Sequence, residues 1–209
     1  YIIEDSAQAH GGKDKFGNNI GKFSDFSCYS FYPGKNLGCY GDGGMVTTNN
    51  RKHYEKLIKL RNLGSKYKHI HDEIGINSRL DTIQSTLLNL KLGSLKKLNQ
   101  KRKQIATFYR KNIKNSKIDI IQYSKYAVFH QFVILVKNRK NLIKLLNKNK
   151  IQFGIHYPRP INKLNCFKKL FKNKKFVNSE LIASNCLSIP IDPNLSLNDQ
   201  KKICSVLNK

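Results

Sequence analysis

Lys35 is the residue of this chain whose surroundings best suit it for chemistry. It follows the apolar run Phe26–Phe31 and a turn at Pro33-Gly34, whereas most other lysines lie among lysines and asparagines, as solvated side chains do. A lysine in a crowded, partly desolvated place loses some of its preference for the charged form, and the neutral amine is a nucleophile toward carbonyls. The pattern therefore indicates Schiff-base chemistry, and the alternative is an ordinary lysine at the end of a strand.

The elements around Lys35 predict where it lies. The run Phe26–Phe31 has the length and aromatic content of a buried strand, which the proline and glycine end, so Ser30 and Lys35 stand at its carboxyl end. Open α/β sheets bind ligands in the crevice beyond the carboxyl ends of their strands. Four glycines then allow close approach of the backbone to a ligand: Gly38, Gly41, Gly43 and Gly44.

The rest of the first half alternates between strand and helix patterns. A strand ending at Asp5, a second strand at 44–48 and a helix starting at Asn49-Asn50 are predicted, and together they favour part of a doubly wound sheet. Residues 64–77 contain few apolar side chains and are predicted to form an exposed loop. A helix beginning at Asn77 to Arg79 follows, with Leu80, Ile83, Leu87 and Leu90 on one apolar face.

The second half is predicted to form a smaller domain, with a boundary near residue 95. A second helix carries Leu95, Leu98, Ile105, Phe108 and Ile113 on one side. Strands are predicted at 129–136 and 151–157, with a helix through Leu142, Leu145 and Leu146 between them and two prolines closing the later strand. Ser196 and Asp199 have the spacing of a capping box at the start of a last helix.

The formal net charge of +26 is unevenly spread along the 209 residues. The first fifty residues carry four lysines against five acidic residues, so the excess lies downstream. There the lysines alternate with asparagine and isoleucine, as in Lys144–Ile151, and no RNP, zinc-finger or helix-turn-helix signature accompanies them. The composition does not favour a nucleic-acid partner, although a positive potential would favour the approach of a nucleotide sugar bearing a diphosphate.

Cysteine and histidine usage argues against disulfides and metals. The five cysteines are scattered, without a C-x-x-C pair, which suits a reducing cytosol. The one close histidine pair, His69 and His71, has neither helical i, i+4 spacing nor nearby cysteines, so no metal site is predicted. No apolar run approaches the length of a membrane span, so a cytoplasmic protein without a membrane partner is expected.

Six separated segments match, in order, the signature of one enzyme family. They are Tyr1–Gly11 (YIIEDSAQAHG), Ser30–Gly38 (SFYPGKNLG), Gly41–Gly44 (GDGG), Gly75–Asp81 (GINSRLD), Gly154–Pro158 (GIHYP) and Leu187–Ile191 (LSIPI). The chain thus resembles the DegT/DnrJ/EryC1/StrS family of sugar aminotransferases, which use pyridoxal 5′-phosphate (PLP) to aminate keto groups on nucleotide-linked sugars. Several motifs in the right order are more specific than any one of them, and they cover nearly all of the chain.

The resemblance implies an α/β architecture, the fold-type-I PLP-dependent transferase fold similar to aspartate aminotransferase. Residues 1–95 would be the C-terminal part of the large PLP-binding domain, with a parallel or mixed sheet, and residues 96–209 the small C-terminal α+β domain. In this family a long segment normally precedes the Asp5 strand and carries a helix N-terminus for the cofactor phosphate and a stacking aromatic ring. The chain is therefore expected to be a fragment.

The resemblance also assigns five cofactor-binding residues, namely Asn77, which is described below, and four within the first 35 residues. Asp5 resembles the carboxylate that pairs with the pyridinium nitrogen of PLP and keeps it protonated. Gln8 resembles the residue bonded to O3′ of the ring, and Ser30 the hydroxyl donor to the 5′-phosphate. Lys35 resembles the lysine that joins PLP as a Schiff base and then moves a proton between substrate Cα and cofactor C4′. On the residues alone, Asp5 suits a helix cap and Ser30 a plain strand position.

Five further residues acquire roles near the substrate or a second subunit. Asn77 resembles an asparagine that reaches into the partner's active site and touches the PLP phosphate, which implies a homodimer with shared sites. His10, Arg79, His156 and Tyr157 stand where the family binds substrate. On the residues alone, Asn77 suits a helix cap, Arg79 a solvated position, and an exposed His-Tyr pair is more often plain surface.

One segment departs from the family pattern. The family usually has a histidine shortly after the His-Tyr-Pro-x-Pro run, where this chain has Asn162-Lys163, so substrate contacts there do not carry over. The implied reaction has two halves: L-glutamate loads nitrogen onto the cofactor, and a keto-sugar then accepts it. Segments 33–38 and 77–81 are closer to relatives acting at C3 of the sugar than at C4. Products of this kind feed surface polysaccharide or glycosylated-metabolite pathways.

Two other functions are open from the sequence. Some relatives are PLP-dependent dehydratases that remove a sugar hydroxyl, but they carry histidine where Lys35 stands, so Lys35 favours transamination. The second is no enzyme: an inactive fragment or a basic binding module, which would bind mixed oligonucleotides with steep salt dependence and show no PLP spectrum.

Overall fold

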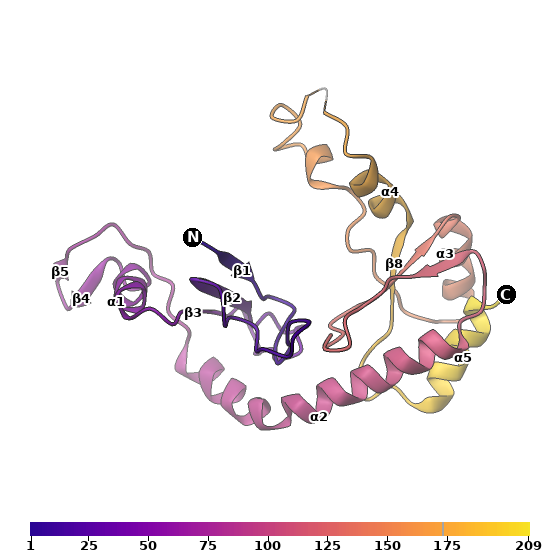
Figure 1. Ribbon diagram of the computed structural model, residues 1–209, viewed down its shortest axis with the longest axis horizontal. Helices are drawn as coiled ribbons and strands as arrows, with labels where there is room; N and C mark the ends of the chain where they lie inside the picture. The colour runs from indigo at the N-terminus through magenta and orange to yellow at the C-terminus, as the bar shows by residue number, and fades with distance from the viewer. Residues whose placement is uncertain (173) are drawn as a thin grey trace. The chain divides into compact units, whose positions relative to one another are not determined.

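The computed structural model describes residues 1–172 and 174–209 as two compact units (Figure 1). The first unit consists of residues 1–100 and 124–130, and the second of residues 101–123 and 131–209. The division into domains at residue 95 remains a prediction from the sequence. Within the described residues, every helix is too short or too polar to cross a membrane.

A three-stranded mixed sheet carries the predicted site of the first unit. β1 (Ile3–Asp5) runs parallel to β2 (Phe26–Ser30), and β3 (Gly44–Thr47) pairs with β2 in the antiparallel sense. The three strands predicted here are confirmed to within two residues at each end. Because parallel strands share one carboxyl edge, Asp5 and Ser30 end at the same side of the sheet.

The connection between β2 and β3 packs on α2 (Thr82–Asn112) through a buried apolar cluster. Its buried members are Phe31, Leu37 and Cys39 from the connection and Leu88 and Leu95 from the helix, with Tyr29 and Leu80 packed against them. The burial gives the loop that carries Lys35 a hydrophobic support of its own.

Helix α1 (Arg51–Leu60) starts where the sequence predicts. The side chain of Asn50 accepts hydrogen bonds from Lys52 N and His53 N at 2.9 and 3.2 Å, which satisfies two of the first backbone donors of the helix. The predicted loop over 64–77 differs, because it contains a small antiparallel hairpin of β4 (Ser65–Tyr67) and β5 (Ile70–His71). These strands are short and largely polar, and they lack the apolar alternation that would predict a strand.

The two helices predicted on either side of residue 93 form one continuous helix, α2 (Figure 1). Gly93 costs about 1 kcal/mol relative to alanine within a helix, which is too little to end it, and no proline follows. The helix also begins at Thr82 and not at Asn77. Of the residues predicted on its first apolar face, Leu80 lies before the helix, and Ile83 and Leu90 are exposed.

The second unit contains an antiparallel sheet in the order β6-β7-β8. Its strands are β6 (Ile118–Ile120), β7 (Phe132–Val136) and β8 (Cys186–Ile189). β7 alternates between buried and half-buried residues, and all four residues of β8 are buried. The predicted strand over 129–136 is thus confirmed in its second part.

Beside the end of α2, further helical segments of the described residues accompany this sheet. They are α3 (Arg139–Lys148), the short 3-10 helix η1 (Ile161–Lys163), α4 (Val177–Asn185) and α5 (Leu197–Leu207). α5 begins after Ser196, whose Oγ accepts a hydrogen bond from Asp199 N at 3.1 Å, so the predicted helix start is confirmed. The Asp199 carboxylate accepts from the Ser196 hydroxyl at 2.5 Å, which differs from the reciprocal backbone bond of a capping box.

The strand predicted over 151–157 was wrong. This segment makes one isolated bridge, between Gly154 and Ser188 of β8, with N–H to carbonyl distances of 2.9 and 2.8 Å. A glycine in the middle and two prolines directly after Tyr157 leave too few residues for regular pairing. The segment therefore touches the edge of β8 at a single point and turns away.

Candidate active site

The carboxyl edge of β1 and β2 presents three predicted cofactor-binding side chains. Asp5 is exposed, and its Oδ1 accepts a hydrogen bond from Ala7 N at 3.0 Å, so the chain turns immediately after the strand. Gln8 is exposed in the same turn. Ser30 Oγ accepts from Tyr32 N at 3.3 Å, which leaves its hydroxyl hydrogen to donate. The edge thus combines a carboxylate, an amide and a hydroxyl donor.

Lys35 lies half-buried in a tight loop directly after β2. Its backbone N–H donates to the carbonyl of Tyr32 at 2.9 Å. The loop folds back so closely that a Cβ added to Gly38 would lie 2.4 Å from Pro33 O. Such a contact is far inside van der Waals distance, so only glycine fits there. The position of the Lys35 backbone is therefore fixed by the loop itself.

His10 lies under this loop and is almost fully buried, with 3% of its surface exposed. Its ring centroid is 5.5 Å from that of Tyr29 and 5.8 Å from that of Phe31. Burial lowers the pKa of His10, the charge of Lys35 lowers it further, and the backbone of Ser30 acts in the opposite sense. Neither ring nitrogen makes a well-formed hydrogen bond within the described part of the chain. The structure therefore brings His10, Ser30 and Lys35 together.

Two asparagines that the sequence analysis did not single out connect the loops of the site. Asn36, next to Lys35, donates from Nδ2 to Asn99 Oδ1 and to Val128 O, both at 2.9 Å. Asn99, on α2, donates from Nδ2 to His10 O at 2.8 Å. Asn36 lies in the matched motif Ser30–Gly38, which assigned it no role, and Asn99 had no sequence signal, because its partner lies far away along the chain.

Asn77 and Arg79 lie elsewhere in the first unit, on an exposed arm that we define as residues 72–79. Asn77 forms a bridge with Asn62 after the end of α1, and Arg79 Nη1 donates to Asn62 Oδ1 at 2.7 Å. The carbonyl of Ile76 accepts from Leu63 N at 3.0 Å. Asn77 therefore does not cap α2, and both predicted site residues are instead held against the end of α1.

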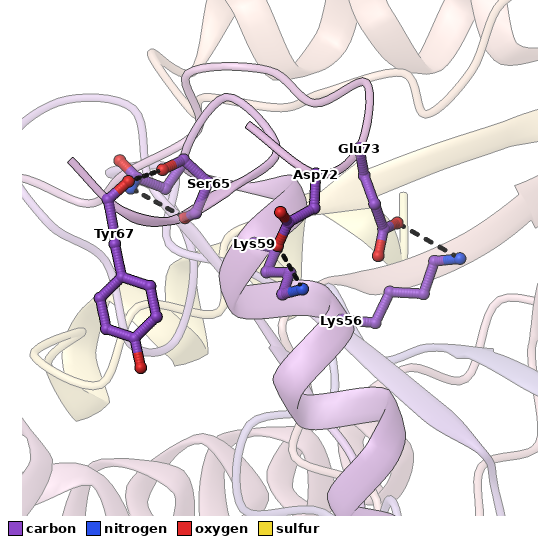
Figure 2. Close-up of polar contacts among 7 residues, drawn as sticks. Lys56, Lys59, Ser65, Tyr67, Asp72 and Glu73 are labelled. Carbon is purple, nitrogen blue, oxygen red and sulfur yellow. Dashed lines mark hydrogen bonds and ion pairs between the residues drawn. The ribbon is translucent and has the colours of Figure 1, made fainter. Parts of the chain in front are cut away.

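Two ion pairs fasten the start of the arm to α1. Figure 2 shows Lys59 and Lys56 extending from the helix toward Asp72 and Glu73, with Nζ to carboxylate distances of 2.7 and 3.4 Å. In the same view, the hydroxyl of Ser65 bonds to the carbonyl of Tyr67 in the hairpin. The hydrogen bond from Lys59 lowers the pKa of the Asp72 carboxyl. The start of the arm is thus held to α1 by ion pairs between largely exposed side chains.

His156 and Tyr157 belong to the second unit. His156 Nδ1 lies 2.9 Å from the hydroxyl of Ser188 in β8, and its ring packs edge-on against Tyr157 at 5.6 Å between centroids. Tyr157 is 67% exposed and lines, with Arg159, a cavity of about 450 Å³. The histidine is thus oriented by the sheet, while the tyrosine faces solvent and the cavity.

Asn162 and Lys163, where the chain departs from the family pattern, make contacts within the second unit. Asn162 is buried, and its Nδ2 donates to Glu180 Oε1 at 3.2 Å. Lys163 Nζ pairs with the same carboxylate oxygen at 3.3 Å. Both side chains therefore bind α4.

The chemistry of the donor set at the edge of the first sheet fits PLP. A carboxylate suits a protonated ring nitrogen, a hydroxyl with a hydrogen to donate suits a phosphate, and a primary amine suits an aldehyde. Asp5, Ser30 and Lys35 supply one group of each kind on adjoining elements.

Comparison with known proteins assigns the chain to a family. The profile of the DegT/DnrJ/EryC1/StrS aminotransferase family matches residues 1–208. A dTDP-3-amino-3,6-dideoxy-alpha-D-galactopyranose transaminase of Aneurinibacillus thermoaerophilus is 40% identical over 210 residues, which cover 100% of this chain and 57% of that protein. The erythromycin biosynthesis sensory transduction protein EryC1 of Saccharopolyspora erythraea is 37% identical over 93% of this chain and 54% of its own length.

Solved structures agree with this assignment. The crystal structure of S. venezuelae DesV in complex with a ketimine intermediate matches 100% of this chain and 57% of that chain, with a TM-score of 0.95 and 33% identity. The expected fold, that of fold-type-I transferases, is thereby confirmed, and the chain spans a little over half the length of these relatives. Six motifs, the fold and the family profile lead to one conclusion: the chain belongs to the DegT/DnrJ/EryC1/StrS aminotransferase family.

Proposed function

We propose that this protein transfers an amino group to the keto group of a nucleotide-linked sugar, with PLP as cofactor. The observation that carries the proposal is the half-buried Lys35, fixed in a tight loop beside His10 and beyond the edge where Asp5 and Ser30 end. A primary amine, an acidic partner and a hydroxyl donor are the groups that such a transfer requires.

Each residue has one task in the proposed reaction. PLP, when bound, supplies an electron sink for breaking a bond at the substrate carbon. Asp5 would keep a proton on the ring nitrogen, Gln8 would donate to O3′, and Ser30 would donate to the phosphate. Lys35 would hold the cofactor through its amine and, with that amine free, would move a proton to and from the substrate carbon as a general base.

The substrates are proposed from the relatives and from the arrangement of the site. Matching relatives are named as transaminases of dTDP- and UDP-linked 3-amino sugars. We assign a nucleotide-linked keto-sugar as acceptor and L-glutamate as donor, for amino-sugar and surface polysaccharide biosynthesis in the cytoplasm. His10, Arg79, His156 and Tyr157 are the proposed substrate-binding residues, although the burial of His10 leaves little of its ring to touch a sugar.

The proposed enzyme is a homodimer with shared sites. Asn77 lies on the exposed arm, so its amide is available to a partner's PLP phosphate. Large apolar side chains are exposed on the arm, at Ile74 and Ile76, and on α2, at Ile83 and Leu90. Burying them between subunits would remove the apolar surface from water, which supports an extensive interface there.

The test of the chemistry is Lys35→Ala in the full-length gene product, with PLP added. We expect the visible absorbance of the lysine-bound cofactor to disappear. The rate of amino transfer from L-glutamate to the keto-sugar should fall by roughly 10²-fold or more, the effect expected for loss of a general base. Lys52→Ala, an exposed lysine on α1, is the control and should keep both properties. Retained turnover in Lys35→Ala would refute the proposal, and loss of a sugar hydroxyl without gain of nitrogen would indicate a dehydratase.

The test of the shared site uses mixed dimers of Lys35→Ala and Asn77→Ala subunits. If Asn77 serves the partner's site, one site of each mixed dimer carries both substitutions and the other is wild type, so mixing restores turnover above that of either parent. If each site is built from one subunit, mixing produces no wild-type site, and turnover stays at the average of the two parents.

A further inference from the structure

Asn36 and Asn99 are joined in a set of hydrogen bonds whose directions are fixed. Asn36 Nδ2 donates to Val128 O, and Asn99 Nδ2 donates to His10 O. Backbone carbonyls only accept, so both amide groups have one possible orientation. In that orientation Asn36 Nδ2 also donates to Asn99 Oδ1, which completes a chain from the residue after Lys35 to the backbone of His10.

The remaining oxygen of Asn36 faces a ring nitrogen. His130 Nδ1 lies 3.3 Å from Asn36 Oδ1, and a hydrogen bond there requires that His130 donate from Nδ1. Asn36 thus uses both hydrogens of its amide and its oxygen. Few side chains can replace it: aspartate has no hydrogens to donate, and alanine has no polar group.

We call the hydrogen-bonded pair of Asn36 and Asn99 the bridge. It joins the two loops that form the candidate site. His10 lies on the connection after β1, Lys35 on the loop after β2, and Asn99 on α2, so three elements meet at one pair of amides. A Cβ added to Gly11 would lie 3.2 Å from Asn99 Nδ2, and Gly11 has φ of 75°, a conformation that favours glycine. The backbone therefore comes close to the amide of Asn99 because residue 11 lacks a side chain.

We infer that Asn36 and Asn99 are positioning residues for the amine of Lys35. This inference rests on the proposed function of Lys35. The amine stands at the end of four rotatable bonds, so the backbone must be placed closely if the amine is to meet both the cofactor and the substrate. A misplacement of about 1 Å can cost on the order of 10²-fold in rate. The bridge sets the spacing between the Lys35 loop and the His10 loop.

The inference predicts a ranked series of variants. Asn36→Asp should reduce kcat most, because its carboxylate would face two acceptors, Val128 O and Asn99 Oδ1. Asn99→Asp should be milder, because it keeps the oxygen that accepts from Asn36 and its carboxylate would face only one acceptor, His10 O. Asn36→Ala and Asn99→Ala should be non-additive when combined, since they break the same bond. Asn89→Ala, an exposed asparagine on the same helix, is the matched control.

Two measurements on the full-length gene product separate positioning from mere stability. The first is amide hydrogen exchange without cofactor, at Lys35 and Cys39, whose N–H groups bond within the loop. The second is kcat and KM with PLP bound. We expect faster exchange at both amides and kcat reduced by roughly 10- to 100-fold in Asn36→Asp, with KM for the sugar within about twofold of wild type.

The outcomes that overturn the inference are distinct from those that overturn the proposed function. Wild-type exchange together with wild-type kcat in Asn36→Asp would show that the bridge positions nothing. A lower melting temperature with unchanged kcat and unchanged local exchange would reduce both asparagines to a general structural role. The proposed function fails separately, on retained turnover in Lys35→Ala, and the exchange experiment still tests the bridge in that case.

Discussion

The loop that carries Lys35 and the arm that carries Asn77 are held in opposite ways. The loop rests on buried apolar side chains and is joined to its surroundings by neutral amide hydrogen bonds at Asn36. The arm is exposed and is held by backbone bonds to the end of α1 and by ion pairs with Lys56 and Lys59. Both positions matter for the proposed reaction, yet Asn77 is exposed and Lys35 is half-buried.

This difference teaches how each region responds to its environment. Hydrogen bonds between neutral, partly buried groups are insensitive to salt, and their loss leaves polar groups unpaired. Exposed ion pairs contribute little individually and weaken as salt rises. The loop is thus suited to holding a reacting group in one place, while the arm retains the freedom to adjust to a partner surface.

The largest effect is expected from Gly38→Ala in the loop. The added Cβ would lie 2.4 Å from Pro33 O and 2.9 Å from Tyr32 O, both backbone atoms that cannot swing aside. The loop must open, which we expect to cost about 1–3 kcal/mol in the free energy of unfolding and to displace Lys35. Urea denaturation and the visible absorbance of the PLP-loaded gene product measure the two effects.

Gly93→Ala on α2 is the matched control for this experiment. A Cβ at residue 93 meets no atom within 4 Å beyond its chain neighbours and the adjoining backbone of its own helix, so the substitution should stabilise the protein by up to about 1 kcal/mol. Equal effects of the two substitutions would mean that the Lys35 loop tolerates movement, and the contrast between loop and arm would disappear.

The local features of the fold could be predicted from the sequence, and the contacts between distant residues could not. Asn50 and Ser196 indicate helix starts because a cap bonds to its own helix, and the aromatic run ending at Ser30 indicates a strand. The bond between Asn36 and Asn99 joins residues 63 positions apart, and nothing local distinguishes Asn99 from the other asparagines. The β4–β5 hairpin was missed because its strands are short and polar.

A smaller effect is expected on the pH dependence of stability through His10. Its pKa is lowered in the folded protein by burial, so between the unfolded value of about 6.5 and the lower folded value the unfolded chain binds more protons. Stability is therefore complete above pH ~6.5 and falls as the pH drops below that value. His10→Asn should flatten this part of the profile of unfolding free energy against pH.

The control for the pH experiment is His69→Asn, in the exposed turn between β4 and β5. We expect its profile of unfolding free energy to keep the wild-type slope below pH ~6.5, because the His69 side chain is exposed in the folded as well as the unfolded chain. If His10→Asn keeps that slope as well, the imidazole is not held neutral under the loop, and the protected character of this region is refuted.

The smallest effect is expected from Lys59→Ala in the arm. The substitution removes the 2.7 Å ion pair to Asp72 but leaves the backbone bonds between residues 61–63 and 76–78. Amide exchange in the arm should rise slightly at low salt and match wild type at high salt, where the Debye length shrinks to about 3 Å near 1 M and the wild-type pair is itself screened. Exchange in the Lys35 loop should be the same at both salt concentrations. If amide exchange in the wild-type arm does not change with salt, its backbone bonds alone hold it. The two regions would then differ in exposure but not in the forces that fix them.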